Sequence, residues 1–232
     1  MYIKDVRERK VIPKMPNWVM NELICSFQTQ EQFESFKSKI NLEGLFHSFI
    51  PMPEILDGTQ SPNINVDKLI AEFNKDGYTA TTLQELAESN LHMFSNLAKN
   101  ALKNQEAFKA TGYSDWYSWN LDNWGVKWDA VRPTAKYDLL TITFSFDSPW
   151  GCPEQFVREL SKLYPNATFE MVSGSIENDC HYEFTCEDGK FEETCSYETF
   201  KEAVIDGKWG GWSEWSELLE ESEELPENQE EA

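Results

Sequence analysis

The chain of 232 residues is 40% hydrophobic and 14% aromatic, which provides enough apolar side chain for a packed core and excludes a natively disordered chain. It contains no run of about 18 apolar residues, which excludes a membrane-spanning helix, and its charged first 16 residues lack the apolar stretch of a secretory signal. We therefore expect a soluble, cytoplasmic protein.

Acidic residues concentrate at the C-terminal end. The formal net charge is −21, and residues 177–232 contain 19 acidic and 3 basic residues, against 22 acidic and 17 basic residues in 1–176. A negative field of this strength repels nucleic-acid phosphates and attracts basic surfaces. The C-terminal quarter is therefore predicted to meet a basic protein surface rather than nucleic acid, unless the acidic excess only maintains solubility.

The number of cysteines is odd, which together with the expected cytoplasmic location predicts free thiols at Cys25, Cys152, Cys180, Cys186 and Cys195. The spacing C-H-x4-C-x8-C from Cys180 onward lacks the C-x2-C pair typical of zinc sites. Neighbouring residues of a strand also point to opposite faces, so Cys180 and His181 would not converge on one ion. We expect no bound metal.

The N-terminal part of the chain predicts a strand, a helix and a second strand. After an N-terminal segment, 1–15, the β-prone run 22–27 is expected to form a strand. Residues 30–41 are expected to form a helix, because Phe33, Phe36 and Ile40 recur on one helical face and Thr29 with Gln32 fits a helix cap. The apolar run 45–50 is interpreted as a short strand closed by proline.

A helical region is expected to follow at 66–113. It begins with a short amphipathic helix at 66–73. The stretch 82–112 then has the broad apolar face of a long helix, with Thr82 and Glu85 suited to its start. Asn90 is a place where this helix could divide into two.

The C-terminal part predicts strands at 139–146 and 168–178 with a helix at 154–164 between them. A hairpin about Asp188 and Gly189 and a short helix over 197–205 should follow. From Ser213 onward the chain has nine glutamates and no lysine or arginine. This tail is interpreted as an acidic amphipathic segment that folds on binding, with a disordered end.

Three tryptophans lie in the segment 119–130, WNLDNWGVKWDA. Their spacing fits neither a strand face nor a helix face, which favours a loop across the sheet with Gly125 at a turn. Buried indoles contribute strongly to a core, so structural packing is the favoured interpretation. The alternative is a ligand pocket formed by Asn123, Trp124, Lys127, Asp129, Asp147 and Trp150.

Sequence patterns typical of an active site are missing: there is no nucleophile elbow, phosphate-binding loop, dinucleotide fingerprint or zinc-protease motif. His47, His92 and His181 are scattered, and Glu54 and Asp147 at strand ends are interpreted as turn residues. We therefore expect no catalytic residue and no cofactor, and favour a protein that is not an enzyme.

Several separated motifs resemble a known family. They are MPNW at 15–18 with Asn21, PMPE at 51–54, NWGVKWDA at 123–130 and FSFDSPW at 144–150. Across 15–178 the chain resembles the YubB ferredoxin-like proteins, which plasmids and tailed phages carry and whose function is unknown. The resemblance implies an α+β fold with a ferredoxin-like sheet, two packing helices and a bacterial host cell.

The expected architecture combines these elements. It has an N-terminal segment at 1–15 and a ferredoxin-like domain at 16–178 with a helical insertion at 66–113. An acidic hairpin and helix extension follows at 179–212, and an acidic, partly disordered tail at 213–232.

These features predict a non-enzymatic interaction protein of a mobile element. It would bind and inhibit a basic host nucleic-acid-binding or defence protein. The specific form of this hypothesis is that the protein mimics DNA. The residues expected to contact the partner are Glu187, Asp188, Glu192, Glu193, Glu214, Trp215, Glu217, Glu220, Glu221, Glu223 and Glu224. The alternatives are a small-ligand-binding protein or enzyme that uses 119–130 and 147–150, and an RNA binder, which the scarcity of basic residues near 139–146 disfavours.

Overall fold

A six-stranded antiparallel sheet forms the centre of the computed structural model, which describes residues 17–75, 77–195 and 197–207. The strands are β1 (Trp18–Phe27), β2 (Val131–Asp138), β3 (Thr141–Pro149), β4 (Ala167–Ser175), β5 (Cys180–Glu187) and β6 (Lys190–Glu193). They lie in the order β2-β3-β1-β4-β5-β6. The first strand, β1, therefore lies between two strands, β3 and β4, that follow it by more than a hundred residues.

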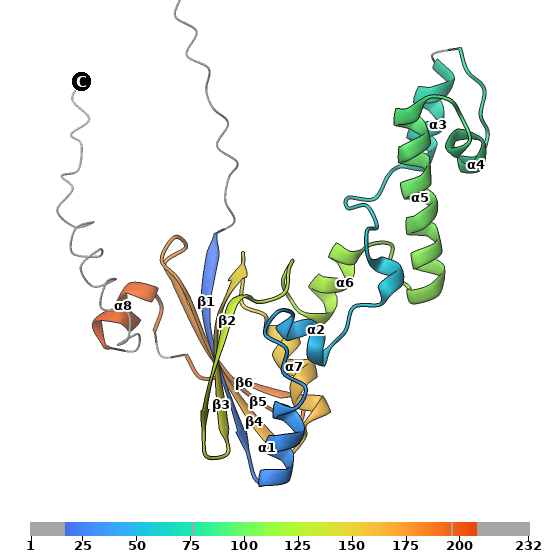
Figure 1. The fold of residues 1–232 in the computed structure, drawn as a ribbon. Coiled ribbons are helices and arrows are strands. Elements are labelled where there is room, and N and C mark those ends of the chain that lie inside the picture. The colour runs from blue at the N-terminus through green and yellow to red at the C-terminus, as the bar shows by residue number, and fades with distance from the viewer. Residues whose placement is uncertain (1–16, 76, 196, 208–232) are drawn as a thin grey trace, which may run out of the picture.

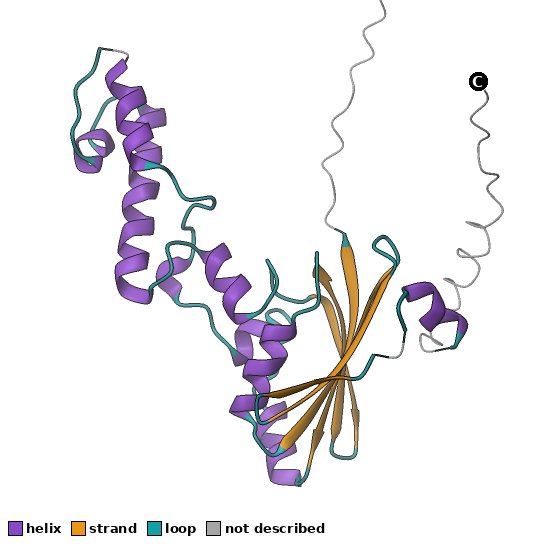
Figure 2. Ribbon diagram, turned by 180° about the vertical axis from the view of Figure 1, so that it is seen from behind, coloured by secondary structure: helices purple, strands orange, loops and turns teal. Residues whose placement is uncertain are grey.

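Helices cover one face of this sheet (Figure 2). They are α1 (Gln30–Lys37), α2 (Leu45–Phe49) and α7 (Glu154–Leu163). Because strand side chains alternate between faces, Leu23 and Cys25 of β1 and Phe144 of β3 all point to the helices and are buried. The ring of Phe36 from α1 lies 6.4 Å from Phe144 and 6.3 Å from Phe169 of β4, which places the main core between sheet and helices.

The opposite face of the sheet, which we call the open face, carries the even-numbered residues of β1. One short helix, α8 (Phe200–Ile205), covers part of it (Figure 1). Phe200 and Ala203 of α8 pack on Met20 of β1, with Val172 and Ile176 at the margin of this small cluster. The remainder of the open face is mostly polar, with Trp18 and Ile24 of β1 as apolar exceptions.

A helical arm projects away from the sheet (Figures 1 and 2). It comprises α3 (Val66–Lys75), α4 (Leu83–Ala87) and α5 (His92–Thr111), and it has a core of its own in which Leu86 and Ala98 are fully buried. The turn η1 (Glu54–Leu56) leads toward the arm and α6 (Trp116–Asn123) leads back from it. In the described part of the chain, no helix combines the length and apolar composition needed to cross a membrane.

The mixed helix-and-strand class predicted from the sequence is confirmed, as are two predicted helix starts. The Thr29 side chain accepts a hydrogen bond from the Gln32 N–H at 3.3 Å, and Thr82 with Glu85 forms a complete capping box. The long helical stretch does divide near Asn90, because α4 ends at Ala87 and α5 begins at His92.

The strand predicted at 45–50 is wrong, because these residues form α2. The Asp129 carboxylate accepts hydrogen bonds from the N–H groups of Phe46 and His47 at 2.7 and 3.0 Å. A carboxylate at this position satisfies backbone donors that the first turn of a helix leaves unpaired. A distant side chain therefore decides the structure of an apolar run that is too short to show a helical period.

The second strand of the N-terminal half is instead β2, which was not predicted. Its sequence VRPTAKYD contains a proline and three charged residues, and it lies at the sheet edge, where proline is tolerated. The predicted loop at 119–130 is also partly wrong, because it begins inside α6. That helix is capped by Asp115, whose side chain accepts the Ser118 N–H at 2.9 Å.

Candidate functional site

A groove opens on the open face where β1 begins and β3 ends. Its volume is about 650 Å³, within the range of small-molecule sites. We call it the open-face groove. Its lining includes Trp18, Met20, Arg132, Ser145, Asp147 and Ile176. The groove thus combines apolar side chains from β1 and the end of β4 with polar side chains from β2 and β3.

An ion pair between Arg132 and Asp147 lies at this groove. The Arg132 Nε is 3.1 Å from the Asp147 Oδ2, and a second guanidinium nitrogen contacts the same oxygen. The Asp147 side chain is 14% exposed and the Arg132 side chain 78% exposed. A guanidinium has five N–H donors, so the pair holds Arg132 in place while other donors still face solvent.

The backbone at the groove adopts an unusual conformation. Arg132 has a φ of 53° at a register shift of β2, and Trp150, just beyond β3, has a φ of 69°. The Trp150 N–H donates to the Asn17 carbonyl at 2.9 Å, next to Trp18 of the groove. Left-handed backbone at non-glycine residues is costly and concentrates at functional sites. Arg132 and Trp150 do not lie in tight hairpin turns, so a turn does not explain their positive φ. Their conformation therefore favours this groove as a functional site.

A buried polar network lies behind the groove. The Asn21 amide donates to the Ser148 hydroxyl at 2.8 Å, and its carbonyl oxygen accepts from Ser173 at 2.8 Å. The Ser173 oxygen lies 3.0 Å from the Cys152 sulfur. Burial raises the pKa of the Cys152 thiol to about 12. The thiol is therefore neutral near pH 7, and this network is better suited to fixing the strand ends than to nucleophilic chemistry.

Carboxylates from neighbouring strands share the open face. Glu170 of β4 lies opposite Thr185 of β5, and Thr185 lies opposite Glu192 of β6, so these side chains point to the same side. Glu187 follows Thr185 by two residues and therefore joins them, with Lys190 opposite it. Glu170, Glu187 and Glu192 are exposed, and we call these three residues the acidic face.

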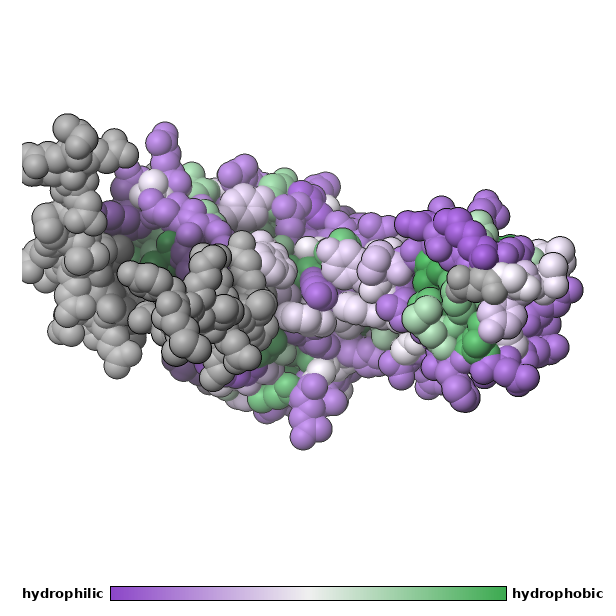
Figure 3. Space-filling view, turned by 90° about the horizontal axis from the view of Figure 1, so that it is seen from above, coloured by the Kyte–Doolittle hydropathy of each residue, from purple (hydrophilic) through white to green (hydrophobic). Residues whose placement is uncertain are grey.

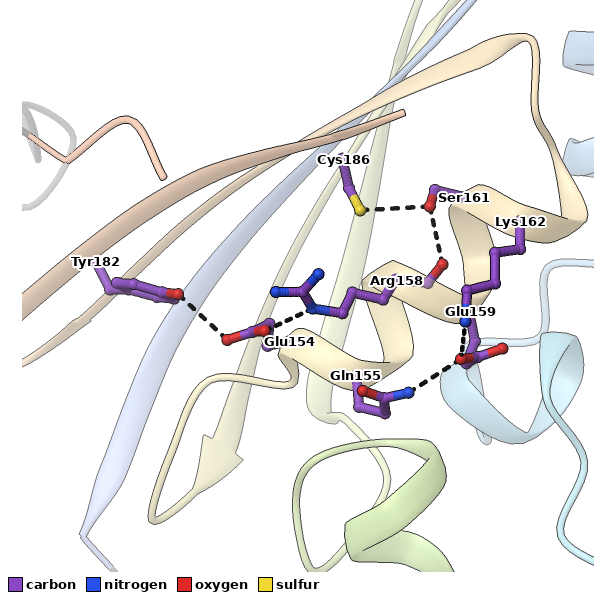
Figure 4. A network of polar contacts seen from close by, with 8 residues as sticks. All are labelled: Glu154, Gln155, Arg158, Glu159, Ser161, Lys162, Tyr182 and Cys186. Atoms are coloured by element: carbon purple, nitrogen blue, oxygen red, sulfur yellow. Dashed lines mark hydrogen bonds and ion pairs between the residues drawn. The ribbon is translucent and has the colours of Figure 1, made fainter. Parts of the chain in front are cut away.

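The hairpin that carries most of the acidic face is fixed to α7 (Figure 4). In the figure Glu154 of α7 reaches both Arg158 and Tyr182, with its two oxygens 2.6 Å from the Arg158 Nε and 3.2 Å from the Tyr182 hydroxyl. Burial, together with the Glu154 charge, raises the pKa of Tyr182. Farther along, the Ser161 hydroxyl accepts the Gly189 N–H at 2.9 Å. These contacts hold the hairpin as a rigid platform.

The four predicted partner-binding residues in the described part of the chain are all exposed, but they do not share one surface. Glu187 and Glu192 lie on the acidic face, and Asp188 lies in the hairpin turn. Glu193 lies opposite Phe184 and so points to the other side of the sheet. The remaining predicted residues lie outside the described residues: Glu214, Trp215, Glu217, Glu220, Glu221, Glu223 and Glu224.

The tryptophan-rich segment contributes mainly to the core. Trp119 and Trp124 are buried, and the Trp124 indole donates to the Ile50 carbonyl at 3.0 Å. Structural packing is therefore confirmed for these two indoles. Trp128 is partly exposed, and the Lys127 ammonium lies 4.5 Å from its ring centroid.

The six residues of the predicted ligand pocket have separate partners. Asp129 caps α2, and the Asn123 amide donates to the Trp119 carbonyl at 2.8 Å. Asp147 lines the open-face groove, and the Trp150 side chain is 52% exposed. The pocket stays a prediction. Arg132, which sequence reasoning missed, sits in the unpredicted strand β2, so no signal in the sequence paired it with Asp147.

The five cysteines are free thiols, as the sequence predicts. Within 17–75, 77–195 and 197–207, no three or more His, Cys, Asp or Glu side chains are grouped so that they could hold a metal ion. His181 is buried under α8 next to Glu183, with 2.6 Å between the His181 Nε2 and the Glu183 carboxylate.

A second exposed surface lies at the far end of the arm, where apolar side chains are visible from above (Figure 3). A shallow hollow of about 410 Å³ there is lined by Tyr78, Leu91, His92, Met93 and Phe94. Met93 is 65% exposed, which is unusual for a large apolar side chain. This surface lies far from the open-face groove.

Comparison with known proteins gives a distant structural likeness. No family model matches the chain, and no curated protein matches it. The chain is similar to the crystal structure of the protein api92 from Yersinia pseudotuberculosis, which carries the domain of unknown function DUF1281. The TM-score is 0.42 at 10% sequence identity, with 78% of this chain and 99% of that chain covered.

Proposed function

We propose that the protein binds a basic macromolecular partner through the acidic face and the acidic C-terminal residues, and that it catalyses no reaction. The observation that carries this proposal is the set of exposed carboxylates that β4, β5 and β6 hold on one side of a rigid sheet. Complementary charge steers a basic partner to such a surface and repels competing acidic ones.

In its concrete form, the partner is a host nucleic-acid-binding or defence protein of a bacterium, which the protein inhibits in the cytoplasm by occupying a DNA-binding surface. Two sequence features support this form: the phage and plasmid resemblance at 15–178, and the balance of 19 acidic against 3 basic residues in 177–232. Direct RNA binding is disfavoured, because the same carboxylates repel phosphate.

We also propose that the fold is of the ferredoxin-like type. The order β2-β3-β1-β4, with α1 after β1 and α7 between β3 and β4, supports this assignment. In this assignment, β2 is the strand that had been predicted at 45–50. The helical arm is then an insertion between α1 and β2, and β5, β6 and α8 extend the sheet beyond its four-stranded core.

The test is capture from bacterial lysate by the immobilised full-length protein. We expect a basic protein to be retained at about 50 mM salt and released by about 500 mM, because surface charges are screened on that scale. A variant with Glu170→Gln, Glu187→Gln and Glu192→Gln should retain at least tenfold less of it.

The matched control carries Glu31→Gln, Glu34→Gln and Glu43→Gln, three exposed positions on and after α1, on the helix-covered side of the sheet. It changes the net charge by the same amount as the acidic-face variant, and it should bind the basic protein as the wild type does. Retention that does not change with salt concentration, or the same loss of retention in both variants, would rule out the acidic face as the binding surface.

The second candidate is a small-ligand site or active site near the 147–150 strand end. The open-face groove at Asp147 is the observation that favours it. This candidate requires the groove to be open to solutes, so a segment of the chain that fills the groove would exclude it.

A further inference from the structure

We infer that the open-face groove binds an α-amino acid with a large apolar side chain. Arg132 holds the carboxylate of this ligand, Asp147 holds its ammonium group, and Trp18 and Met20 contact its side chain. The ligand class rests on the second candidate function, a small-ligand site near the 147–150 strand end, and goes beyond it by naming what binds. The acidic face takes no part in this site.

The guanidinium of Arg132 has unused hydrogen-bond donors at a fixed position. Its two contacts with the Asp147 Oδ2 use two of the five N–H groups, which leaves three for a ligand. The side chain is largely exposed, so these donors face solvent. Because a planar guanidinium pairs with a carboxylate through two parallel hydrogen bonds, Arg132 is suited to an anionic group of a ligand.

The charges around the groove disfavour a ligand that is only an anion. The charged residues in the groove, or on the same face of the strands beside it, are Glu22, Arg132, Lys136, Asp138, Asp147 and Glu177. Carboxylates outnumber cations among them, so the surroundings of the groove are negative. A ligand that places a carboxylate on Arg132 therefore needs a positive charge of its own.

The Asp147 carboxylate can accept that positive charge. Both contacts from Arg132 end on its Oδ2, and in the described part of the chain no hydrogen bond ends on its Oδ1. An α-amino acid carries its carboxylate and its ammonium group on one carbon, and the groove presents a guanidinium and a carboxylate in direct contact. The two pairs of charges are complementary in sign and in spacing, which a free anion or a free amine cannot match.

The β1 side of the groove is apolar and held in place. Met20 and Ile176 line it and also belong to the small cluster in which Phe200 of α8 packs, so α8 fixes their position. Trp18 adds an aromatic ring to this lining. An aliphatic or aromatic ligand side chain would bury apolar surface against an indole and a thioether there. The groove therefore favours an amino acid with a large apolar side chain over a small or polar one.

The test is a titration of the ¹⁵N-labelled full-length protein with L-phenylalanine and with L-leucine, followed by NMR. We expect the amide signals of Thr134, Ser145 and Asp147 to shift, with a dissociation constant of about 1 mM or tighter. Three further probes should bind about tenfold more weakly or worse. They are 3-phenylpropionate, which lacks the ammonium group, phenethylamine, which lacks the carboxylate, and L-alanine, which lacks the large side chain.

Two charge variants test the paired recognition. Arg132→Gln should weaken L-phenylalanine binding about tenfold, because it removes the guanidinium donors. Its matched control is Lys136→Gln, which makes the same charge change on the same face of β2 but does not line the groove, and it should bind as the wild type does. Asp147→Asn should weaken L-phenylalanine but strengthen 3-phenylpropionate, because the guanidinium is then no longer neutralised.

A third variant tests the position of the site without changing any charge. Ser145→Phe fills the groove from β3, where an aromatic residue is compatible with a strand, and it should abolish binding. Thr143→Phe is its matched control, since Thr143 lies on the same face of β3 but does not line the groove. It should leave binding unchanged.

Three results would overturn the inference. Equal affinity for L-phenylalanine and for 3-phenylpropionate or phenethylamine would mean that the groove does not recognise both charges, and the small-ligand site would then stand with a different ligand class. Binding of L-phenylalanine that Ser145→Phe leaves unchanged would place the ligand elsewhere. If none of the probes shifts a groove signal, the small-ligand site fails together with this ligand class. None of these results bears on the acidic face.

Discussion

Asp129 acts on a helix that begins more than 80 residues earlier in the chain. It accepts hydrogen bonds from Phe46 and His47 in the first turn of α2, and replacing it with alanine leaves those donors unpaired. We expect Asp129→Ala to lower the free energy of unfolding by about 2 kcal/mol, measured by urea denaturation.

Asp122→Ala is the control for this substitution, because Asp122 is exposed near the C-terminal end of α6. Its effect should stay within about 0.5 kcal/mol. An Asp129→Ala protein as stable as the wild type would show that the carboxylate has no structural role, and would favour the ligand-pocket alternative for the tryptophan-rich segment.

Burial sets the order in which the cysteines react. Burial raises the pKa of Cys152 to about 12 and that of Cys25 well above its usual value, whereas Cys180 is exposed and its pKa is raised less. The thiolate is the nucleophile, so iodoacetamide at pH 8 should modify Cys180 before Cys25 or Cys152. The Cys180 rate should rise about tenfold per pH unit and continue to rise beyond pH 9.

Timed samples analysed by mass spectrometry would give these rates. In urea Cys25, Cys152 and Cys180 should react at similar speed, which shows that the folded structure protects the buried thiols. Modification of Cys152 ahead of Cys180 in the folded protein would mean that the strand ends behind the groove open readily.

The β5–β6 hairpin depends on one glycine. Gly189 has a φ of +71°, and a Cβ added there would lie 2.8 Å from the Lys162 Cγ of α7. Gly189→Ala therefore combines backbone strain with a steric clash, and we expect a loss of about 2 kcal/mol together with faster amide exchange in β5 and β6.

Gly112→Ala is the matched control. Gly112 has a φ of +81° at the end of α5, but nothing lies within 4 Å of an added Cβ. It should lose only about 1 kcal/mol, and exchange in the hairpin should not change. Equal losses for the two substitutions would mean that contact with α7 does not constrain the hairpin.

Elements with a strong internal pattern could be predicted from the sequence. In β3 buried and partly exposed residues alternate as the pattern required, and the Asp188–Gly189 turn forms the predicted hairpin. The run 45–50 is too short to distinguish a helix from a strand, and its structure depends on Asp129. The groove could not be predicted either, because it also depends on residues from different elements. The Arg132–Asp147 pair forms only when β2 and β3 are paired in their observed register.

At the scale of the whole molecule, the net charge lowers the stability of the folded state and apolar packing raises it. The net charge of −21 is a source of self-repulsion that unfolding relieves. Glu187, Glu192 and Glu193 concentrate part of it on one hairpin, which hydrogen bonds from Tyr182 to Glu154 and from the Gly189 N–H to Ser161 hold against α7. The stability of the protein should therefore depend on ionic strength in a direction that its net charge sets.

Raising sodium chloride from about 10 to about 150 mM shortens the screening length from roughly 30 to 8 Å. We expect the thermal midpoint to rise by about 2–4 °C, which for a chain of this size corresponds to roughly 1 kcal/mol. A variant with Glu187→Gln, Glu192→Gln and Glu193→Gln should show a smaller rise, because it begins with less repulsion. A midpoint that falls with salt would mean that attractive pairs such as Glu154–Arg158 outweigh the net repulsion. The negative charge of the acidic surface would then be compensated within the protein, and it would not attract a basic partner.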